Sequence, residues 1–174
     1  KILPMDDPKT AEILKKVYDS SNRLAKLVTD LLNVSRIESG RLIVEKQSFD
    51  INKVIQIAVS ELKVKADQKN LKLLWSPQVH PKVIADKDKL KQVLTNVIGN
   101  AIKYTEKGKI EITTEVEKDK ELGIKLEGNG SNIKKNPVKG DFIVVHIKDT
   151  GVGIPEEELG NIFKKFSRLG DWQT

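Results

Sequence analysis

Two short segments carry the residues whose types and spacing could perform chemistry. In the first, Asn96, Asn100 and Lys103 recur at intervals of four and three residues, so on a helix all three project from one face. Asparagine is a poor helix former because its side chain competes for backbone hydrogen bonds, and two of them one turn apart call for a reason. An amide oxygen can ligate a hard cation such as Mg²⁺, and the lysine could meet a phosphate. A solvated polar face is the alternative interpretation.

The second segment is Asp149-Thr-Gly-Val-Gly-Ile154, which directly follows an apolar run. Its two glycines, Gly151 and Gly153, allow the backbone to approach a ligand closely. A carboxylate at the end of a strand can accept a hydrogen bond from an exocyclic amine such as that of adenine. The segment lacks the Gly-Lys-Ser/Thr of a P-loop and the third glycine of a dinucleotide fingerprint. Alone it is a weak signal, since many turns look like it.

The elements that must position these segments follow from helix caps and apolar periodicity. Asp7-Pro8 predicts a helix start, and Ser39-Gly40 predicts its end. Between them runs a heptad row sustained for roughly three heptads; its members are Ile13, Val17, Ser20, Leu24, Leu27, Leu31 and Val34. A helix of this length cannot bury its own stripe, so we expect a dimerisation helix or, alternatively, a helix packed on its own domain.

Two further helices begin at aspartate caps. After an extended link at 41–49, Asp50 and Asp86 predict their starts, and the second of these helices runs to about Tyr104. On it, apolar periodicity predicts a buried face made of Leu90, Val93, Leu94, Val97, Ile98 and Ala101. Pro155 and the acidic residues after it predict a short final helix.

Strands alternate with these helices. Alternating or short apolar runs predict strands at 71–75, 83–85 and 110–116, and a nearly continuous apolar run at 142–147 predicts a central strand. The stretch 118–140 is rich in glycine, asparagine and lysine and predicts a long loop or a disordered insertion. A long helix followed by mixed helices and strands makes the fold class α+β.

Composition narrows the function classes. The absence of cysteine and the presence of only two histidines argue against disulfides, thiol chemistry and a zinc site, and a cytoplasmic location is expected. The net charge is +6, but the lysines interleave with 25 acidic residues and only 5% of residues are aromatic, so we expect no nucleic-acid partner. No apolar run reaches the ~18–20 residues of a membrane helix, so we expect no membrane contact by this segment, although the parent protein could be anchored.

Taken together, the two segments make the chain resemble the sensor histidine kinases of two-component signalling. Asn96–Thr105 resembles their N box and Asp149–Ile154 their first glycine box; Phe163-Lys-Lys-Phe166-Ser-Arg168 resembles the F box. The heptad helix resembles the second helix of the dimerisation and phosphotransfer domain. The resemblance implies a bundle-helix segment at 1–45 and, at 46–174, an α/β sandwich of the histidine kinase/Hsp90/gyrase ATP-binding type.

The resemblance also implies roles for individual residues. Asn96 and Asn100 would hold Mg²⁺ on the phosphates of ATP, mainly through Asn100, while Lys103 would touch phosphate and Tyr104 would pack near the nucleotide. Asp149 would bind the adenine amino group, Gly151 and Gly153 would shape the pocket floor, and Ile154 would line it. Arg168 would be the catalytic residue, because a cation aimed at the γ-phosphate stabilises the charge of phosphoryl transfer.

One position separates two branches of this fold. In related ATPases of the gyrase, Hsp90 and MutL type, a glutamate stands four residues before the metal-binding asparagine and acts as general base for water. Here Asn96 occupies that position, and an amide cannot take up a proton. Hydrolysis is therefore disfavoured, and phosphoryl transfer to a protein acceptor is favoured.

The departures from the family pattern matter as well. No histidine precedes His80, so the phosphoacceptor is lacking, and the second glycine-rich box has no counterpart. We therefore expect a truncated fragment, incomplete at its C-terminal end and inactive alone. The parent would be an ATP-dependent protein histidine kinase that homodimerises through the N-terminal helix and passes phosphate to a response regulator. The alternatives are a non-catalytic interaction module on the same fold and a serine kinase of the anti-sigma type.

Overall fold

The computed structural model describes residues 7–77, 79, 81–122 and 138–162. The chain divides into two compact units: Lys1–Ile43 belongs to the first, and Val44 begins the second. The described part of the first unit contains α1 (Pro8–Glu38), whose N-cap Asp7 accepts a hydrogen bond from the Lys9 backbone N–H at 3.3 Å. Beyond its end, Gly40 adopts a left-handed φ of +65°, as a helix C-terminus favours. Both predicted boundaries of this helix are confirmed.

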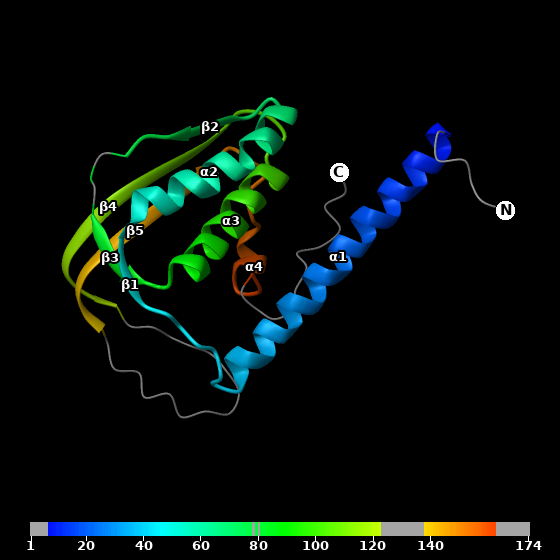
Figure 1. The fold of residues 1–174 in the computed structure, drawn as a ribbon. Helices are drawn as coiled ribbons and strands as arrows, with labels where there is room; N and C mark the ends of the chain where they lie inside the picture. Colours follow the sequence, from blue (N-terminus) through cyan, green and yellow to red (C-terminus); the bar gives the residue numbers. More distant parts are fainter. Residues whose placement is uncertain (1–6, 78, 80, 123–137, 163–174) are drawn as a thin grey trace. The chain divides into compact units, whose positions relative to one another are not determined.

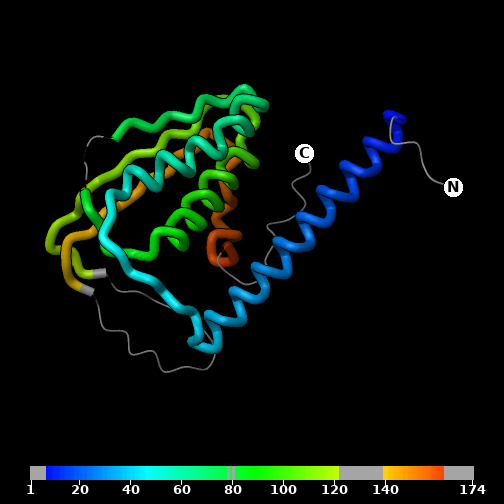
Figure 2. Tube along the Cα trace, in the orientation of Figure 1, coloured from blue at the N-terminus to red at the C-terminus, as the bar shows by residue number. Residues whose placement is uncertain are grey.

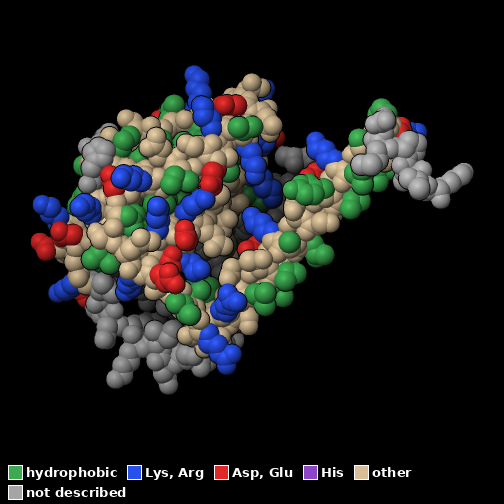
Figure 3. All heavy atoms as spheres, viewed as in Figure 1, with side chains coloured by type: hydrophobic (Ala, Val, Ile, Leu, Met, Phe, Trp, Pro, Cys, Tyr) green, Lys and Arg blue, Asp and Glu red, His purple; other side chains and the backbone are tan. Residues whose placement is uncertain are grey.

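The described part of the first unit does not cover the apolar stripe of α1. Thr10 is the one buried residue of this helix, and Leu24 on the heptad row is 63% exposed. Hydrophobic side chains gather along the whole length of α1 in Figure 3. The large apolar side chains exposed on it are Ile13, Leu14, Val17, Tyr18, Leu24, Leu27, Val28, Leu31, Leu32 and Ile37.

The second unit is a two-layer sandwich. Its elements are β1 (Gln47–Asp50), α2 (Ile51–Gln68), β2 (Lys72–Trp75), β3 (Lys82–Ala85), α3 (Lys87–Tyr104), β4 (Lys109–Leu122), β5 (Val138–Asp149) and α4 (Glu156–Leu159). Figure 1 shows α2 and α3 side by side across one face of the sheet, and the tube in Figure 2 shows the same arrangement. The predicted α+β class is confirmed, and none of the described helices combines the length and hydropathy needed to cross a bilayer.

The second unit contains two sheets. β1 pairs antiparallel with β3, so part of the link predicted at 41–49 is a strand. In the larger sheet, of order β2-β4-β5, β2 runs parallel to β4 and β4 runs antiparallel to β5. Among the described strands β4 is therefore the middle one, and the prediction that 142–147 forms a central strand is wrong. Within the apolar run there, Ile143, Val145 and Ile147 pack against the core from alternate positions, and Phe142 and Val144 between them are partly buried.

The predicted loop at 118–140 is partly strand. β4 continues to Leu122 and β5 begins at Val138, with the pairing continuing across a register shift between Glu117 and Lys120. Asp119, at that irregularity, has a φ of +51° and donates its backbone N–H to Asp141 Oδ1 at 3.2 Å. Cross-strand pairing supplies the order that a composition of glycine and lysine did not predict. The remainder of the stretch, 123–137, lies outside the described residues.

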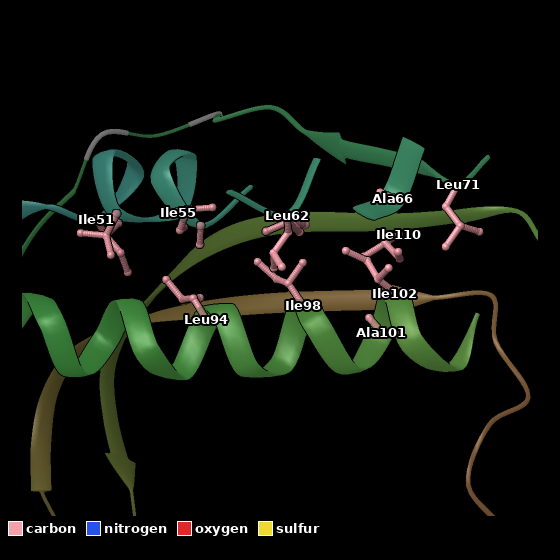
Figure 4. Close-up of a cluster of buried hydrophobic side chains, with 13 residues drawn as sticks. Ile51, Ile55, Leu62, Ala66, Leu71, Leu94, Ile98, Ala101, Ile102 and Ile110 are labelled. Atoms are coloured by element: carbon pink, nitrogen blue, oxygen red, sulfur yellow. The ribbon is translucent and has the colours of Figure 1, made fainter. Parts of the chain in front are cut away.

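The core lies between the two helices and the sheet. Ile55 and Leu62 of α2 point toward Leu94 and Ile98 of α3 in Figure 4, and Ile110 of β4 closes the cluster from the sheet. Burial of one such side chain contributes about 1.5–3 kcal/mol. This packing fixes the face that α3 turns away from the core, where the polar residues singled out by the sequence stand.

Candidate functional site

The helix α3 begins at Asp86, whose carboxylate accepts hydrogen bonds from three backbone N–H groups. Asp86 Oδ1 accepts the backbone N–H groups of Asp88 and Lys89 at 3.1 and 3.0 Å, which is the predicted helix cap. Asp86 Oδ2 accepts the backbone N–H of Glu45 at 3.0 Å, so the same side chain also holds the segment before β1. The hydrogen bonds from Lys89 and Glu45 lower the pKa of Asp86 from its ordinary value.

The polar residues of α3 lie where the spacing predicted. Leu94, Ile98, Ala101 and Ile102 are buried, whereas Asn96, Asn100 and Lys103 are exposed. The side chains of Asn96 and Asn100 have no hydrogen-bond partner among the described residues, so their amide oxygens can accept a ligand. An exposed pair of amide oxygens one turn apart suits a hard cation that takes its other ligands from phosphate oxygens.

Two residues assigned to the buried face of α3 are exposed. Val93 is 56% and Val97 45% exposed, which corrects that part of the prediction. The reason is geometric, because α2 and the sheet cover the stripe of Leu94, Ile98 and Ala101. Successive residues on a helix point in different directions, so Val93 and Val97, each one position before a buried residue, lie outside the covered stripe. Val93 and Val97 therefore add apolar surface beside the two asparagines, and sequence reasoning missed them because an apolar residue on a helix is normally assigned to the core.

The C-terminal end of α3 is held by an ammonium group. Lys69 Nζ, at the end of α2, donates to the carbonyl oxygens of Ile102, Lys103 and Thr105 at 3.0, 2.8 and 3.2 Å. The last carbonyls of a helix lack intrahelical partners and carry partial negative charge, so the cation satisfies them directly. Lys69 thereby fixes the turn of α3 that carries Lys103 and Tyr104, and no sequence pattern indicates this role because the contact spans more than thirty residues.

Lys103 and Tyr104 also contact each other. The Lys103 ammonium lies 4.7 Å from the centre of the Tyr104 ring and 3.0 Å from its hydroxyl oxygen. Tyr104 is 47% exposed as a residue, so part of its surface is open to a ligand. A cation over an aromatic ring is attracted to it by about 0.5–1 kcal/mol at an exposed position, which holds both side chains at the end of the helix.

The loop after β5 docks on this end of α3. Asp149 Oδ1 accepts the backbone N–H of Gly151 at 2.8 Å, and the Val152 N–H approaches the Tyr104 carbonyl oxygen at 3.4 Å. A Cβ on Gly151 would lie 2.5 Å from that same carbonyl oxygen, which no side chain tolerates, so this close approach requires glycine. Gly153 adopts a φ of +73°, which glycine alone adopts without strain.

The other predicted site residues are Asp149, Gly153 and Ile154, which the structure describes, and Arg168, which it does not. Val152, Gly153, Ile154 and Pro155 line a hollow of about 260 Å³, so Gly153 and Ile154 border an open space. Asp149 is exposed, and its Oδ2 has no hydrogen-bond partner in the described part of the chain. The structure thus brings Tyr104 to the loop at 149–152, but no hydrogen bond or ion pair between described residues joins Asn96 or Asn100 to that loop. Arg168 and the other F-box residues lie outside the described residues.

Comparison with known proteins gives a family. Residues 85–173 match the family described as Histidine kinase-, DNA gyrase B-, and HSP90-like ATPase. Hybrid signal transduction histidine kinase L of Dictyostelium discoideum is 32% identical over 159 residues, 89% of this chain and 8% of that protein. Signal transduction histidine-protein kinase BarA of Escherichia coli (strain K12) is 31% identical over 161 residues, 91% of this chain and 16% of that protein.

A solved structure shows the same fold. Full-length ShkA in complex with AMPPNP superposes with a TM-score of 0.73 at 21% identity, covering 93% of this chain and 31% of that chain. The chain therefore belongs to the histidine kinase-, DNA gyrase B- and HSP90-like ATPase family, and its resemblance to sensor histidine kinases is confirmed. It spans less than a fifth of the length of either curated relative.

Proposed function

We propose that this chain carries part of the Mg-ATP site of a protein histidine kinase in a two-component system. The observation that supports it most is the docking of the 149–152 loop on the end of α3. Val152 N–H lies 3.4 Å from the Tyr104 carbonyl oxygen, and Asp149 Oδ1 holds Gly151 N–H at 2.8 Å. In our proposal the base acceptor and the phosphate-side residues would stand on two segments that meet at the Tyr104 carbonyl oxygen.

The base would bind at the loop. The exposed carboxylate of Asp149 keeps Oδ2 available in the described structure, and it would accept a hydrogen bond from the adenine amino group. Gly151 and Gly153 leave the backbone bare for a planar ring to approach, and Ile154 offers apolar contact at the hollow. Tyr104, half-exposed beside Val152, would pack near the nucleotide.

The phosphates would bind along α3. The amide oxygens of Asn96 and Asn100 are the groups that would hold Mg²⁺, with Asn100 the principal ligand, because the described residues contain no cluster of three or more carboxylate, histidine or cysteine side chains that could hold an ion instead. Bound there, the ion would neutralise phosphate charge. Lys103 would contact a phosphate oxygen, and we retain Arg168 as the proposed γ-phosphate contact.

Phosphoryl transfer to a protein is the proposed reaction. Asn96 stands where related ATPases carry a general base, and it cannot accept a proton. In our proposal, therefore, Asn96 does not activate a water molecule for hydrolysis of ATP. The γ-phosphoryl group would instead go to a histidine and then to a response regulator. The kinase names of the curated relatives support this reading. We further propose that this segment works in the cytoplasm.

The apolar row of α1 supports homodimerisation. Ten large apolar side chains are exposed on that helix, and a heptad row of this kind is typical of a helix that packs against other helices. A second copy would cover the row with an identical one. The alternative, a non-catalytic interaction module, rests on this same surface and differs in predicting no nucleotide binding.

Titration calorimetry with AMPPNP, with and without Mg²⁺, tests the proposal. We expect saturable binding that weakens by at least about tenfold in Asp149→Asn, because the uncharged amide presents an NH₂ donor as well as an acceptor. Asp141→Asn, the same change elsewhere on β5, should bind like the wild type. Asn100→Ala should remove the Mg²⁺ dependence. Absence of binding by a folded wild-type chain would favour the interaction module.

A further inference from the structure

Thr150, between the proposed base acceptor and the first glycine of the loop, is bonded to a different part of the sandwich. Its hydroxyl oxygen accepts the backbone N–H of Lys109 at 3.1 Å and donates to the Lys107 carbonyl oxygen at 3.1 Å. The Lys109 carbonyl oxygen, at 3.4 Å, is a second acceptor for the same proton. One side chain thus joins the end of β5 to the turn between α3 and β4.

The turn is shaped to receive this hydroxyl. Gly108 has a φ of +114°, and a Cβ built on it would overlap Thr150 Oγ1. Lys72 N–H also donates to the Gly108 carbonyl oxygen at 3.0 Å, so the turn is also held by the first residue of β2. Thr150 is therefore anchored to a fixed part of the sandwich.

Asp149 gains an anchor from its neighbour. Its carboxylate is exposed and accepts one hydrogen bond among the described residues, from Gly151 of its own loop. The backbone is held before this point by the pairing of Asp149 with Ile110 and after it by the Val152 N–H at the Tyr104 carbonyl oxygen. Between these two points the Thr150 hydroxyl joins the loop to residues about forty positions away. An acceptor displaced by about 1 Å loses much of its directed hydrogen bond.

We propose that Thr150 is a positioning residue that sets the Asp149 carboxylate for the exocyclic amine of a nucleotide base. This inference rests on the proposed nucleotide site and adds to it a residue that governs the choice of base. The hydroxyl does not touch the base. It acts by holding the backbone of residues 149–151 against the 107–109 turn.

The test compares the binding of two nucleotides and the hydrogen exchange of two backbone amides. Thr150→Val keeps the shape of the side chain and removes the hydroxyl, Thr150→Ser restores it, and Thr113→Val makes the same change at an exposed position on β4. Binding of ADP and of IDP, whose base carries a carbonyl in place of the amine, is measured on each full chain. Hydrogen exchange of the Gly151 and Lys109 amides is measured without nucleotide.

In Thr150→Val we expect ADP to bind about tenfold more weakly while IDP binding changes by less than about twofold, so that base selectivity falls. The Gly151 amide should exchange about tenfold faster, because its acceptor Asp149 Oδ1 is no longer held in place. Thr150→Ser and Thr113→Val should behave like the wild type. Thr150→Ala serves as a second hydroxyl-free variant should the valine perturb folding.

Two outcomes overturn the proposal. Faster exchange at Lys109 with unchanged Gly151 exchange and unchanged selectivity would make Thr150 a clamp of the turn alone. An equal loss of ADP and IDP affinity, not restored by serine, would indicate general damage to the loop. If the wild type binds neither nucleotide, the proposed function fails, and Gly151 exchange alone decides whether Thr150 holds the Asp149 carboxylate.

Discussion

The helices α1 and α3 were both predicted from an apolar stripe and an aspartate cap, yet their surroundings differ. On α3 the stripe of Leu94, Ile98, Ala101 and Ile102 is buried under α2 and the sheet, whereas on α1 only Thr10 is buried. The local rule that starts both helices is the same, because an aspartate side chain caps the first turn of each. An apolar stripe therefore predicts that a helix needs a partner, and for α3 the tertiary structure shows that α2 and the sheet provide it.

The sharpest way to break this comparison is to truncate one apolar residue on each helix. Ile98→Ala leaves a cavity in a fully buried site and should lower the free energy of unfolding of the sandwich by about 2–5 kcal/mol. Leu27→Ala, on the exposed row of α1, should change it by less than about 0.5 kcal/mol at concentrations where the chain is monomeric. Urea denaturation measures both, and comparable losses in the two variants would contradict the contrast.

A charge on the α1 row tests whether a second copy covers it. Leu27→Asp should weaken self-association by about 1–3 kcal/mol, because dimer formation would bury the carboxylate among apolar side chains. Asn22→Asp adds the same charge at an exposed position off the heptad row and should leave association unchanged. Sedimentation equilibrium measures the dimer constant, and equal effects of the two aspartates would point to general charge repulsion.

Removing the Lys69 ammonium tests how much the stability of α3 depends on this contact from the end of α2. Lys69→Met keeps the aliphatic stem and removes three charged hydrogen bonds, so we expect a loss of about 1 kcal/mol in the free energy of unfolding, a small value because the group is exposed. Lys65→Met, one turn earlier on α2, is the control. Thermal unfolding that shifts equally in both variants would show that the carbonyl contacts add nothing.

The smallest expected effect concerns the start of α3. Hydrogen bonds to the charged form lower the pKa of Asp86 in the folded chain, so its contribution to stability is present above its ordinary pKa of 3.8 and is lost as the pH falls through the lower folded value. The stability difference between wild type and Asp86→Asn should therefore be constant near neutrality and shrink below pH 3.8. Acid titration of both proteins followed by circular dichroism checks this, and a difference that grows on acidification would contradict it.

Much of the fold was predictable because its signals are local. Asp7, Asp50 and Asp86 each accept the backbone N–H two residues on, so the start of every long helix is encoded within a few residues. The strands around Leu73 and Ile84 were predicted from short apolar patterns in the same way. The prediction for 118–140 was wrong in part, since its strand ends gain order from pairing with each other rather than from composition.

The candidate site was predictable in its residue types and in the helix face that three of them share. The spacing of Asn96, Asn100 and Lys103 determined that all three share the exposed face of α3, because helical periodicity depends on the backbone alone. The tertiary structure decided that Val93 and Val97 share the exposed side of α3, that Lys69 holds the end of this helix, and that Thr150 reaches the turn at Gly108. Those contacts join residues thirty to forty positions apart, and no local rule specifies which distant backbone groups the packing of two helices on a sheet will bring within hydrogen-bond reach.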